Sequence, residues 1–295
     1  MRFYCLGDLM VDVVARLFGP LVEGSDSPAV ISYVGGGSAA NTAAWLATAG
    51  VETIFVGAVG DDAVGQTQVA ALRALGVDVH GRVDHDRPTG TCLVLVAPNG
   101  ERTMVPDAGA NLALLDYDVP TDEFEPGDHL HVSGYALLRD SRDAALQAIS
   151  NATSVGMTVS VGAASTAPLR VVGGAEFLGL LPEQVLLFAN ESEAAVLVGS
   201  RFGSAAELAS TLATASRSVV VTAGSGEAVW ADGSSLVSLA AEALPAAELD
   251  TTGAGDAFAA GFLAARARGA VPQVCLRDGH ALAAAACRTV GGRPG

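Results

Sequence analysis

The sequence predicts a three-layer α/β/α protein, in which helices cover both faces of a mostly parallel sheet and a small second β-sheet forms a lid. Two observations carry this prediction. Short Val/Leu-rich runs alternate with alanine-rich helical stretches along the chain of 295 residues. One β-rich segment, residues 88–107, interrupts that alternation. With no internal repeat or long linker, residues 1–295 are expected to form a single domain.

Composition and charge narrow the class of partner. Asp and Glu number 32 against 16 for Lys and Arg, a formal charge of −16. Nucleic acid and anionic membranes both require a basic surface, so neither is expected as a partner. Membrane-spanning apolar runs, a signal-peptide apolar region and C-x-x-C pairs are all missing from the sequence, which predicts a cytoplasmic protein with reduced thiols.

The first 107 residues are expected to supply the start of the large sheet and all of the lid. The hairpin at residues 88–107 turns at Pro98, Asn99 and Gly100, and should join strands within about residues 10–34 as the lid. Strands are predicted at residues 3–8, 9–17, 29–34 and 52–62, and glycine-terminated helices at 41–50 and 63–76.

The α/β alternation returns from residue 127 onward. Strands are predicted at residues 129–134, 157–162, 184–190 and 217–224, followed by an antiparallel pair at 227–232 and 235–240. Helices are predicted at residues 141–156, 191–199 and 275–292, and after the glycine turn near residue 253.

Residues 250–262, DTTGAGDAFAAGF, predict a tight glycine turn that opens a buried helix. Asp256 follows Gly253 and Gly255 in the first turn, where backbone N–H groups lack helical partners and attract anions. Such a site suits phosphoryl transfer, because the carboxylate can accept the proton of an attacking hydroxyl. Alternatively, Asp256 only complements the helix dipole and the glycines only make a turn; the stretch alone supports both equally.

Candidates for substrate binding lie near the beginning of the chain. Asp12, in an apolar strand, could accept two hydrogen bonds from a vicinal diol, or could lie at an exposed edge. Gly36 and Gly37 could bring backbone close to a polyhydroxyl ligand, with Asn41 as donor and acceptor; Asn41 could also be an ordinary cap. These glycines lack G-x-G-x-x-G spacing, so NAD binding is disfavoured.

Three further candidates lie in the second half. Asn190 and Glu193 could hold Mg²⁺ partly through water, or cap a helix. The TAGSG stretch at residues 222–226 could let backbone approach a nucleotide, or merely connect two strands. His280 could stack near a base, or be structural. Because ligands of open α/β sheets bind at the carboxyl ends of strands, candidates that follow strands favour one shared site.

These stretches resemble the ribokinase-like carbohydrate kinases, also called the phosphofructokinase-B family, over nearly the whole chain. DTTGAGDAF is similar to the family's C-terminal signature, and GGGSAANTAAWLATAG followed by VGAVGDDAVG to its N-terminal signature. Asn190 and Glu193 match its N-x-x-E pattern. The resemblance implies a β lid over the sugar, ATP and Mg²⁺ as cosubstrates, and often a monovalent cation such as K⁺ near the turn at Asp250.

The resemblance also implies roles for individual residues, and it implies by analogy only a homodimer through the lid. An unperturbed aspartate titrates at about 3.9, so the base is expected to be ionised at neutral pH. Arg102 in the lid could meet a carboxylate or phosphate of the substrate, or pair with an acidic surface residue, which we slightly prefer. The implied roles are: base, Asp256; anion hole, Gly253, Ala254 and Gly255; substrate hydroxyls, Asp12, Gly36, Gly37 and Asn41; Mg²⁺ and phosphate, Asn190 and Glu193; nucleotide, Thr222, Gly224, Gly226 and His280.

Departures from the family pattern leave the substrate open. Ser38 stands where ribokinases usually have lysine, Ser133 about where they have a sugar-binding glutamate, and Gly162 where many members have Asp or Asn. We expect an ATP-dependent kinase that phosphorylates a hydroxyl of a sugar or sugar acid. The alternatives are a nucleoside kinase of the same fold, a non-catalytic sugar-binding kinase homologue and, third, an NAD-dependent oxidoreductase.

Overall fold

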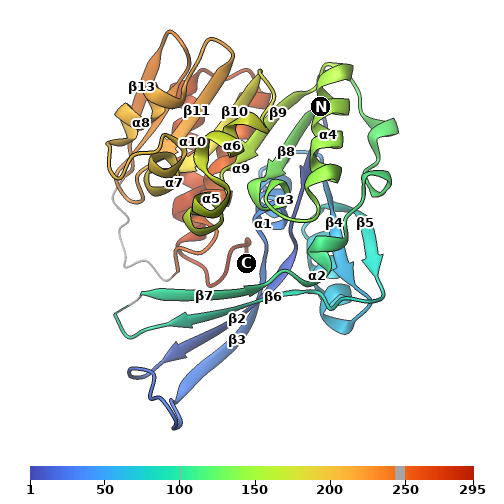
Figure 1. Ribbon diagram of the computed structural model, residues 1–295, viewed down its shortest axis with the longest axis vertical. Coiled ribbons are helices and arrows are strands. Elements are labelled where there is room, and N and C mark those ends of the chain that lie inside the picture. The colour runs from blue at the N-terminus through green and yellow to red at the C-terminus, as the bar shows by residue number, and fades with distance from the viewer. Residues whose placement is uncertain (100, 243–249) are drawn as a thin grey trace.

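A large sheet and a smaller one that projects from it organise the computed structural model, which describes residues 1–99, 101–242 and 250–295 (Figure 1). In these residues the large sheet has the order β13-β12-β11-β10-β9-β8-β1-β4-β5. Its strands pair in parallel from β11 to β5, while β12 pairs antiparallel with both β11 and β13. Its strands are β1 (Phe3–Leu6), β4 (Thr53–Gly60), β5 (Asp78–Asp84), β8 (His129–Ser133), β9 (Thr158–Gly162), β10 (Val185–Asn190), β11 (Arg217–Thr222), β12 (Glu227–Ala231) and β13 (Leu236–Ala240).

Helices cover both faces of this sheet, because its central strands are apolar on both sides. In β1, Tyr4 and Leu6 pack into one helical layer, and Phe3 and Cys5 into the other. The first layer contains α3 (Gly134–Leu137), α4 (Arg142–Val155), α5 (Thr166–Val172), α6 (Gly174–Gly179), α7 (Glu191–Leu197) and α8 (Ala205–Leu212); the second contains α1 (Ser38–Thr48), α2 (Ala63–Ala74), α9 (Ala254–Ala267) and α10 (Pro272–Ala286).

The smaller sheet, here called the lid, has the order β3-β2-β6-β7 and projects from the end of the molecule where α9 begins (Figure 1). Its side chains alternate between two faces, as the two-residue period of a strand requires. Met10, Val14, Cys92 and Val94 form a small buried cluster on the inner face. The lid strands are β2 (Met10–Leu17), β3 (Ala29–Gly36), β6 (Gly90–Val96) and β7 (Arg102–Asp107).

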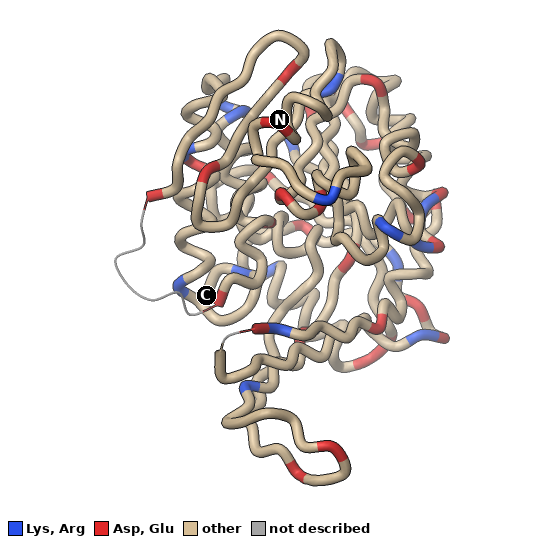
Figure 2. The backbone as a smooth tube through the Cα atoms, turned by 60° about the vertical axis from the view of Figure 1, so that its left-hand side comes forward, with Lys and Arg blue, Asp and Glu red and all other residues tan. Residues whose placement is uncertain are grey.

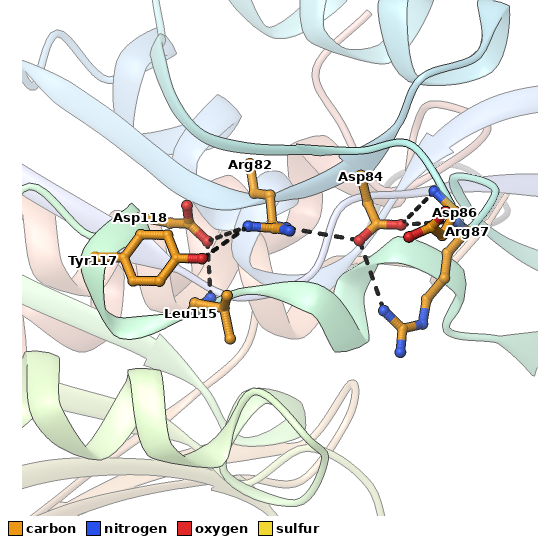
Figure 3. Close-up of polar contacts among 7 residues, drawn as sticks. All are labelled: Arg82, Asp84, Asp86, Arg87, Leu115, Tyr117 and Asp118. Carbon is orange, nitrogen blue, oxygen red and sulfur yellow. Dashed lines mark hydrogen bonds and ion pairs between the residues drawn. The ribbon is translucent and has the colours of Figure 1, made fainter.

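Charged side chains hold the connection from β5 to the lid strand β6 (Figure 3). Oδ1 of Asp84 accepts hydrogen bonds from the backbone N–H groups of Asp86 and Arg87, at 3.0 and 2.7 Å. Its Oδ2 lies 3.6 Å from both Arg82 and Arg87, and Arg82 also reaches Asp118 at 3.8 Å. The hydrogen bond from Arg87 is the main cause that holds the pKa of Asp84 below its usual value. The base of the lid is thereby fixed to the edge of the large sheet.

The predicted fold class is confirmed, but several elements differ in detail. Strand β5 was not expected, because its sequence DVHGRVD has no apolar run and lies at a sheet edge. Helices α3, α5, α6 and α8 were not expected either. The last helix ends at Ala286, well before residue 292, and the chain then turns into the site described below. Gly100 of the predicted hairpin turn lies outside the described residues.

Basic positions are scattered among more numerous acidic ones in the view of Figure 2, as the composition predicts. Within the described ranges, no helix combines the length and apolarity needed to cross a bilayer.

Candidate active site

Asp256 lies in the first turn of α9, where its carboxylate meets two side chains from α1. Ser38 Oγ donates to its Oδ1 at 2.7 Å, and Asn41 Nδ2 donates to its Oδ2 at 2.9 Å. Both helices begin beside the lid, with glycine N-caps at Gly37 and Gly253. The two helix starts therefore converge on one carboxylate.

The environment of Asp256 changes its titration. Burial raises its pKa to about 7; the hydrogen bonds from Asn41 and Ser38 lower it, and the carboxylates of Asp8 and Asp12 raise it. The pKa of Asp256 is thus raised above the ordinary aspartate value on which the expectation of full ionisation rested. The sequence alone does not show this raised pKa, because it depends on the burial of Asp256 in the fold and on carboxylates from the other end of the chain. A carboxylate that titrates near neutral pH is a stronger base than an ordinary one.

The turn before Asp256 has the geometry of an anion site. Gly253 has a φ of 73°, a left-handed conformation that glycine adopts without strain. A Cβ at this position would lie 2.5 Å from the Cα of Gly292. The N–H of Ala254 donates to the carbonyl of Thr251 at 3.3 Å. The N–H groups of Gly255 and Asp256, in the first turn of α9, have no helical carbonyl to bind and can face an anion.

Asp12 lies on the inner face of the lid and is only 4% exposed. Within the described residues, its carboxylate accepts no hydrogen bond. Burial raises its pKa to about 6, while Arg293 lowers it and Asp8 and Asp250 raise it. A Cβ on Gly36 would collide with this carboxylate, so only glycine lets β3 pass here. A buried carboxylate without donors is suited to accept hydroxyl groups of a ligand.

Asn190 and Glu193 form a reciprocal capping box at the start of α7. The Asn190 N–H and Nδ2 donate to the two oxygens of Glu193, at 3.0 and 2.7 Å, and Asn190 Oδ1 accepts from the Glu193 N–H at 2.9 Å. Burial raises the pKa of Glu193 to about 7, and the charge of Asp256 contributes to that increase. Glu193 therefore faces the same site as Asp256. Among the described residues, no group of three or more His, Cys, Asp or Glu is arranged to hold a metal ion.

A cavity of about 810 Å³ extends from the TAGSG loop to the start of α9. Gly224, Thr251, Ala254 and His280 are among the residues that line it. His280 Nε2 lies 3.0 Å from the carbonyl oxygen of Leu239, so the ring is held in place as well as exposed to the cavity. The cavity is large enough for a nucleotide and reaches the anion turn. The lining residues do not include Thr222, Gly226, Asn190 or Glu193.

The position of Arg102 differs from the interpretation that we slightly preferred. Its partner is Asp250, whose side chain is 6% exposed, and not an acidic surface residue. Arg102 Nη2 lies 3.2 Å from Asp250 Oδ1, and its Nη1 donates to Thr252 Oγ1 at 3.1 Å. The lid is therefore connected to the turn that precedes α9.

Sequence reasoning missed Asp8, Gln68 and Arg293 as members of this site. Oδ1 of Asp8 accepts from Ser133 Oγ at 2.8 Å, and its Oδ2 from the N–H of Ser38 at 3.1 Å. The position of Asp8 directly after the first strand was a usable signal. For Gln68 in α2 and Arg293 after α10, neither motif nor strand end marked the residue.

Comparison with known proteins identifies the family of this chain. The model of the "pfkB family carbohydrate kinase" family matches residues 2–295, and the chain belongs to that family. It is 32% identical to an ATP-dependent ribose-1-phosphate kinase of Halopiger xanaduensis over 90% of this chain and 84% of that one. It is also 32% identical to a fructokinase of Salmonella typhimurium, over 92% and 86%. The resemblance inferred from the signatures is confirmed.

Solved structures show the same fold. An adenosine kinase from Sinorhizobium meliloti superposes with a TM-score of 0.87 at 28% identity, covering 99% of this chain and 95% of that one. A fructokinase from Vibrio cholerae O395, solved with fructose, ADP and a calcium ion, gives 0.78 at 26% identity, with 99% and 94% covered. A double mutant of a fructokinase from the same source was solved with fructose, ADP and a potassium ion. The chain is thus a kinase whose relatives include sugar and nucleoside kinases.

Proposed function

We propose that this protein is an ATP-dependent kinase that transfers the γ-phosphoryl group to a hydroxyl of a sugar, with Asp256 as general base. The observation that carries the proposal is the position of Asp256. It follows by two residues Ala254, which lines the nucleotide-sized cavity, and its carboxylate accepts a hydrogen bond from Asn41 and is influenced by the charge of Asp12. ATP as cosubstrate also fits the cytoplasmic location predicted from the sequence.

The chemistry follows from this arrangement. The substrate hydroxyl donates its proton to Asp256 as its oxygen attacks the γ-phosphorus and the bond to ADP breaks. The N–H groups at the start of α9 hold the phosphoryl oxygens, and Asp12 accepts hydrogen bonds from other substrate hydroxyls. Glu193 would hold Mg²⁺ through water molecules, because both of its carboxylate oxygens already accept hydrogen bonds from Asn190. When bound, Mg²⁺ neutralises charge on the phosphates.

The charge of the site favours a neutral substrate over a sugar acid. The negative charge of Asp8 raises the pKa of both Asp12 and Asp256, and that of Asp12 also raises the pKa of Asp256, so the three carboxylates lie close together. Arg102 and Arg293 are already engaged, Arg102 by Asp250 and Arg293 by Asn41, Gln68 and Gly36. A carboxylate or phosphate on the substrate would meet three carboxylates, and Arg139, which lines a small pocket with Asp8 and has a buried Nη1 without a hydrogen-bond partner, is the nearby cation that could offset one of them.

A nucleoside is the second candidate substrate. The high structural similarity to an adenosine kinase supports it. A neutral nucleoside also satisfies the charge argument. The two candidates separate in one experiment, since a nucleoside kinase would phosphorylate adenosine or cytidine and leave free sugars unchanged.

The decisive test is an assay of ADP formation with MgATP over ribose, fructose, 2-keto-3-deoxygluconate, tagatose 6-phosphate, adenosine and cytidine. We expect turnover with a neutral sugar or nucleoside, and a strongly reduced rate in Asp256→Asn. Turnover with 2-keto-3-deoxygluconate or tagatose 6-phosphate alone would contradict the charge argument. Sugar binding without ADP formation would favour the non-catalytic homologue, and thermal stabilisation by NAD but not ATP would revive the oxidoreductase.

We also propose a homodimer formed through the outer face of the lid. Tyr33, Val13, Leu93 and Val105 are register partners in a row across the four lid strands. Tyr33, Leu93 and Val105 are 74%, 48% and 52% exposed. A contiguous exposed apolar row of this kind favours self-association. Light scattering should give a dimer mass for the wild type and a monomer mass for Leu93→Asp; a monomeric wild type would contradict the proposal.

A further inference from the structure

The segment at residues 291–293, which follows the end of α10 by a few residues, passes through the centre of the site. The carbonyl oxygen of Gly292 accepts a hydrogen bond from Trp45 Nε1 at 2.9 Å, and the N–H of Gly291 donates to Asp250 Oδ2 at 3.0 Å. A Cβ on Gly292 would collide with the Asn41 amide. The backbone is therefore pressed between α1 and the turn before α9, and it delivers the next side chain, Arg293, into the site.

Arg293 is 8% exposed, and its guanidinium touches three separate elements. Nη2 donates to the Gly36 carbonyl of β3 at 2.7 Å, and Nη1 to Gln68 Oε1 of α2 at 3.0 Å. Nε donates to Asn41 Oδ1 of α1 at 3.4 Å. All three acceptors are neutral. Its pKa is lowered by burial to about 10, while Asp12 and Asp8 raise it, so the group remains charged at neutral pH.

The contact with Asn41 decides which end of that amide faces the base. A guanidinium can only donate hydrogen bonds, so it requires the amide oxygen on its own side. The amide nitrogen is then directed to Asp256, which as a carboxylate can only accept, and it lies 2.9 Å from Oδ2. Without Arg293, no guanidinium would hold the Asn41 amide oxygen away from Asp256. The amide could then turn its oxygen towards the Asp256 carboxylate, and that orientation is repulsive.

We propose that Arg293 is a positioning residue of the phosphoryl-transfer site, which fixes the Asn41 amide against Asp256 and ties the lid strand β3 to α1 and α2. It acts through Asn41 and Gly36, and has no direct contact with Asp256 in the structure. This inference rests on the proposed function for its effect on turnover. Its effect on the titration of Asp256 is independent of turnover.

The experiment compares wild type, Arg293→Met, Arg293→Lys and the exposed-arginine control Arg170→Met. We expect Arg293→Met to lower kcat about 10- to 100-fold, since small misplacement of reacting groups has effects of that size. The acid limb of its kcat/KM profile should move to higher pH, because Asp256 loses a well-oriented donor. Arg293→Lys should recover only part of kcat, because one ammonium cannot reach three acceptors as a planar fork does. Arg170→Met should match the wild type.

A carboxyl ¹³C NMR titration separates the two proposals. Asp256, assigned by its loss in Asp256→Asn, should titrate at higher pH in Arg293→Met than in wild type even if no substrate is found. The carboxylates that face Asp256 are Asp8 and Asp12, so their titrations are followed in the same spectra. A higher pKa of Asp256 in Arg293→Met, found without turnover of any substrate, would contradict only the proposed function. If Arg293→Met fails to fold, Arg293→Lys carries the same comparison. An unchanged Asp256 titration and unchanged kcat in a folded variant would overturn the role of Arg293.

Discussion

The Arg102 guanidinium on the lid lies 3.2 Å from the Asp250 carboxylate in the turn before α9. Oδ1 of Asp250 also accepts from the N–H of Thr252 at 2.9 Å, and Oδ2 from the N–H of Gly291 at 3.0 Å. Both oxygens thus have partners within the protein, one of them cationic. The sequence resemblance implies a monovalent cation near this turn, and Arg102 already places a positive charge on the carboxylate there.

Activity is therefore expected to change less than about twofold when K⁺ replaces a tetraalkylammonium ion, since Arg102 already neutralises Asp250. Arg102→Ala should lower kcat by about tenfold, because it leaves a carboxylate at the anion turn without its counter-charge. Added K⁺ should restore part of that loss. Initial rates at constant ionic strength measure both effects.

Arg16→Ala is the matched control, because Arg16 lies in the lid strand β2 and its variant should behave as wild type. Strong activation of the wild type by K⁺ would show that Asp250 accepts a cation after all. Wild-type rates in Arg102→Ala would show that the ion pair has no part in turnover.

The exchange Asp256→Asn removes the proposed base and keeps the shape of the side chain. We expect kcat to fall about 10²- to 10⁴-fold, the range typical of general-base catalysis, with the far-UV circular dichroism spectrum unchanged. Asp140→Asn, at an exposed aspartate, provides the control. Retention of most of the wild-type kcat by Asp256→Asn would assign the base to another group.

The pH dependence of kcat/KM should show an acid limb near pH 7. The reason is the pKa of Asp256, which burial raises to about 7: below that pH the carboxyl binds a proton and cannot accept another. The rate therefore rises as the pH rises through that value. Glu193, with a pKa of about 7, can contribute to the same limb, so the profile of Glu193→Gln is measured alongside. A limb near pH 4 in the wild type would contradict the raised pKa.

Two alanine substitutions in the anion turn should differ in their effect on the free energy of unfolding. At Gly253 the left-handed φ and the approach of Gly292 both exclude a Cβ, so Gly253→Ala should cost about 1–3 kcal/mol in the free energy of unfolding. At Gly255 a Cβ would have no atom of the described structure within 4 Å, so Gly255→Ala should leave that free energy almost unchanged. Urea titrations measure both. Equal destabilisation would mean that the turn is not held by the Gly253–Gly292 contact.

Apolar pattern and glycine placement were sufficient to predict most of the large sheet. Strands such as β1 and β4 are buried on both faces and therefore appear as continuous apolar runs. Strand β5 could not be found in this way, because most of its side chains are exposed or half-buried and it therefore has no continuous apolar run. The glycine caps of α1 and α9 were visible as motifs because few other residues tolerate those backbone angles.

The site was less predictable than the fold, because its electrostatics depend on contacts between distant parts of the chain. Asp12, Asn41 and Asp256 were named as candidates from their motifs. The burial that raises the pKa of Asp256, and the partners that orient it, are properties of the folded protein. Arg293 had no motif at all, and its contact with Asn41 spans 252 positions. Single-sequence patterns carry no information on such pairs.

The passage of residues 291–293 between α1 and α9 also has a consequence for biosynthesis. The large sheet, the lid and most of both helical layers can form from earlier parts of the chain. The Asn41 amide, in contrast, gains its hydrogen bond from Arg293 only after residue 293 has been synthesised. A polypeptide whose synthesis stops in α10 would thus resemble the finished protein in secondary structure and lack its ordered centre. Assembly of the site would therefore follow the synthesis of residues 291–293, whatever the order in which the two sheets form.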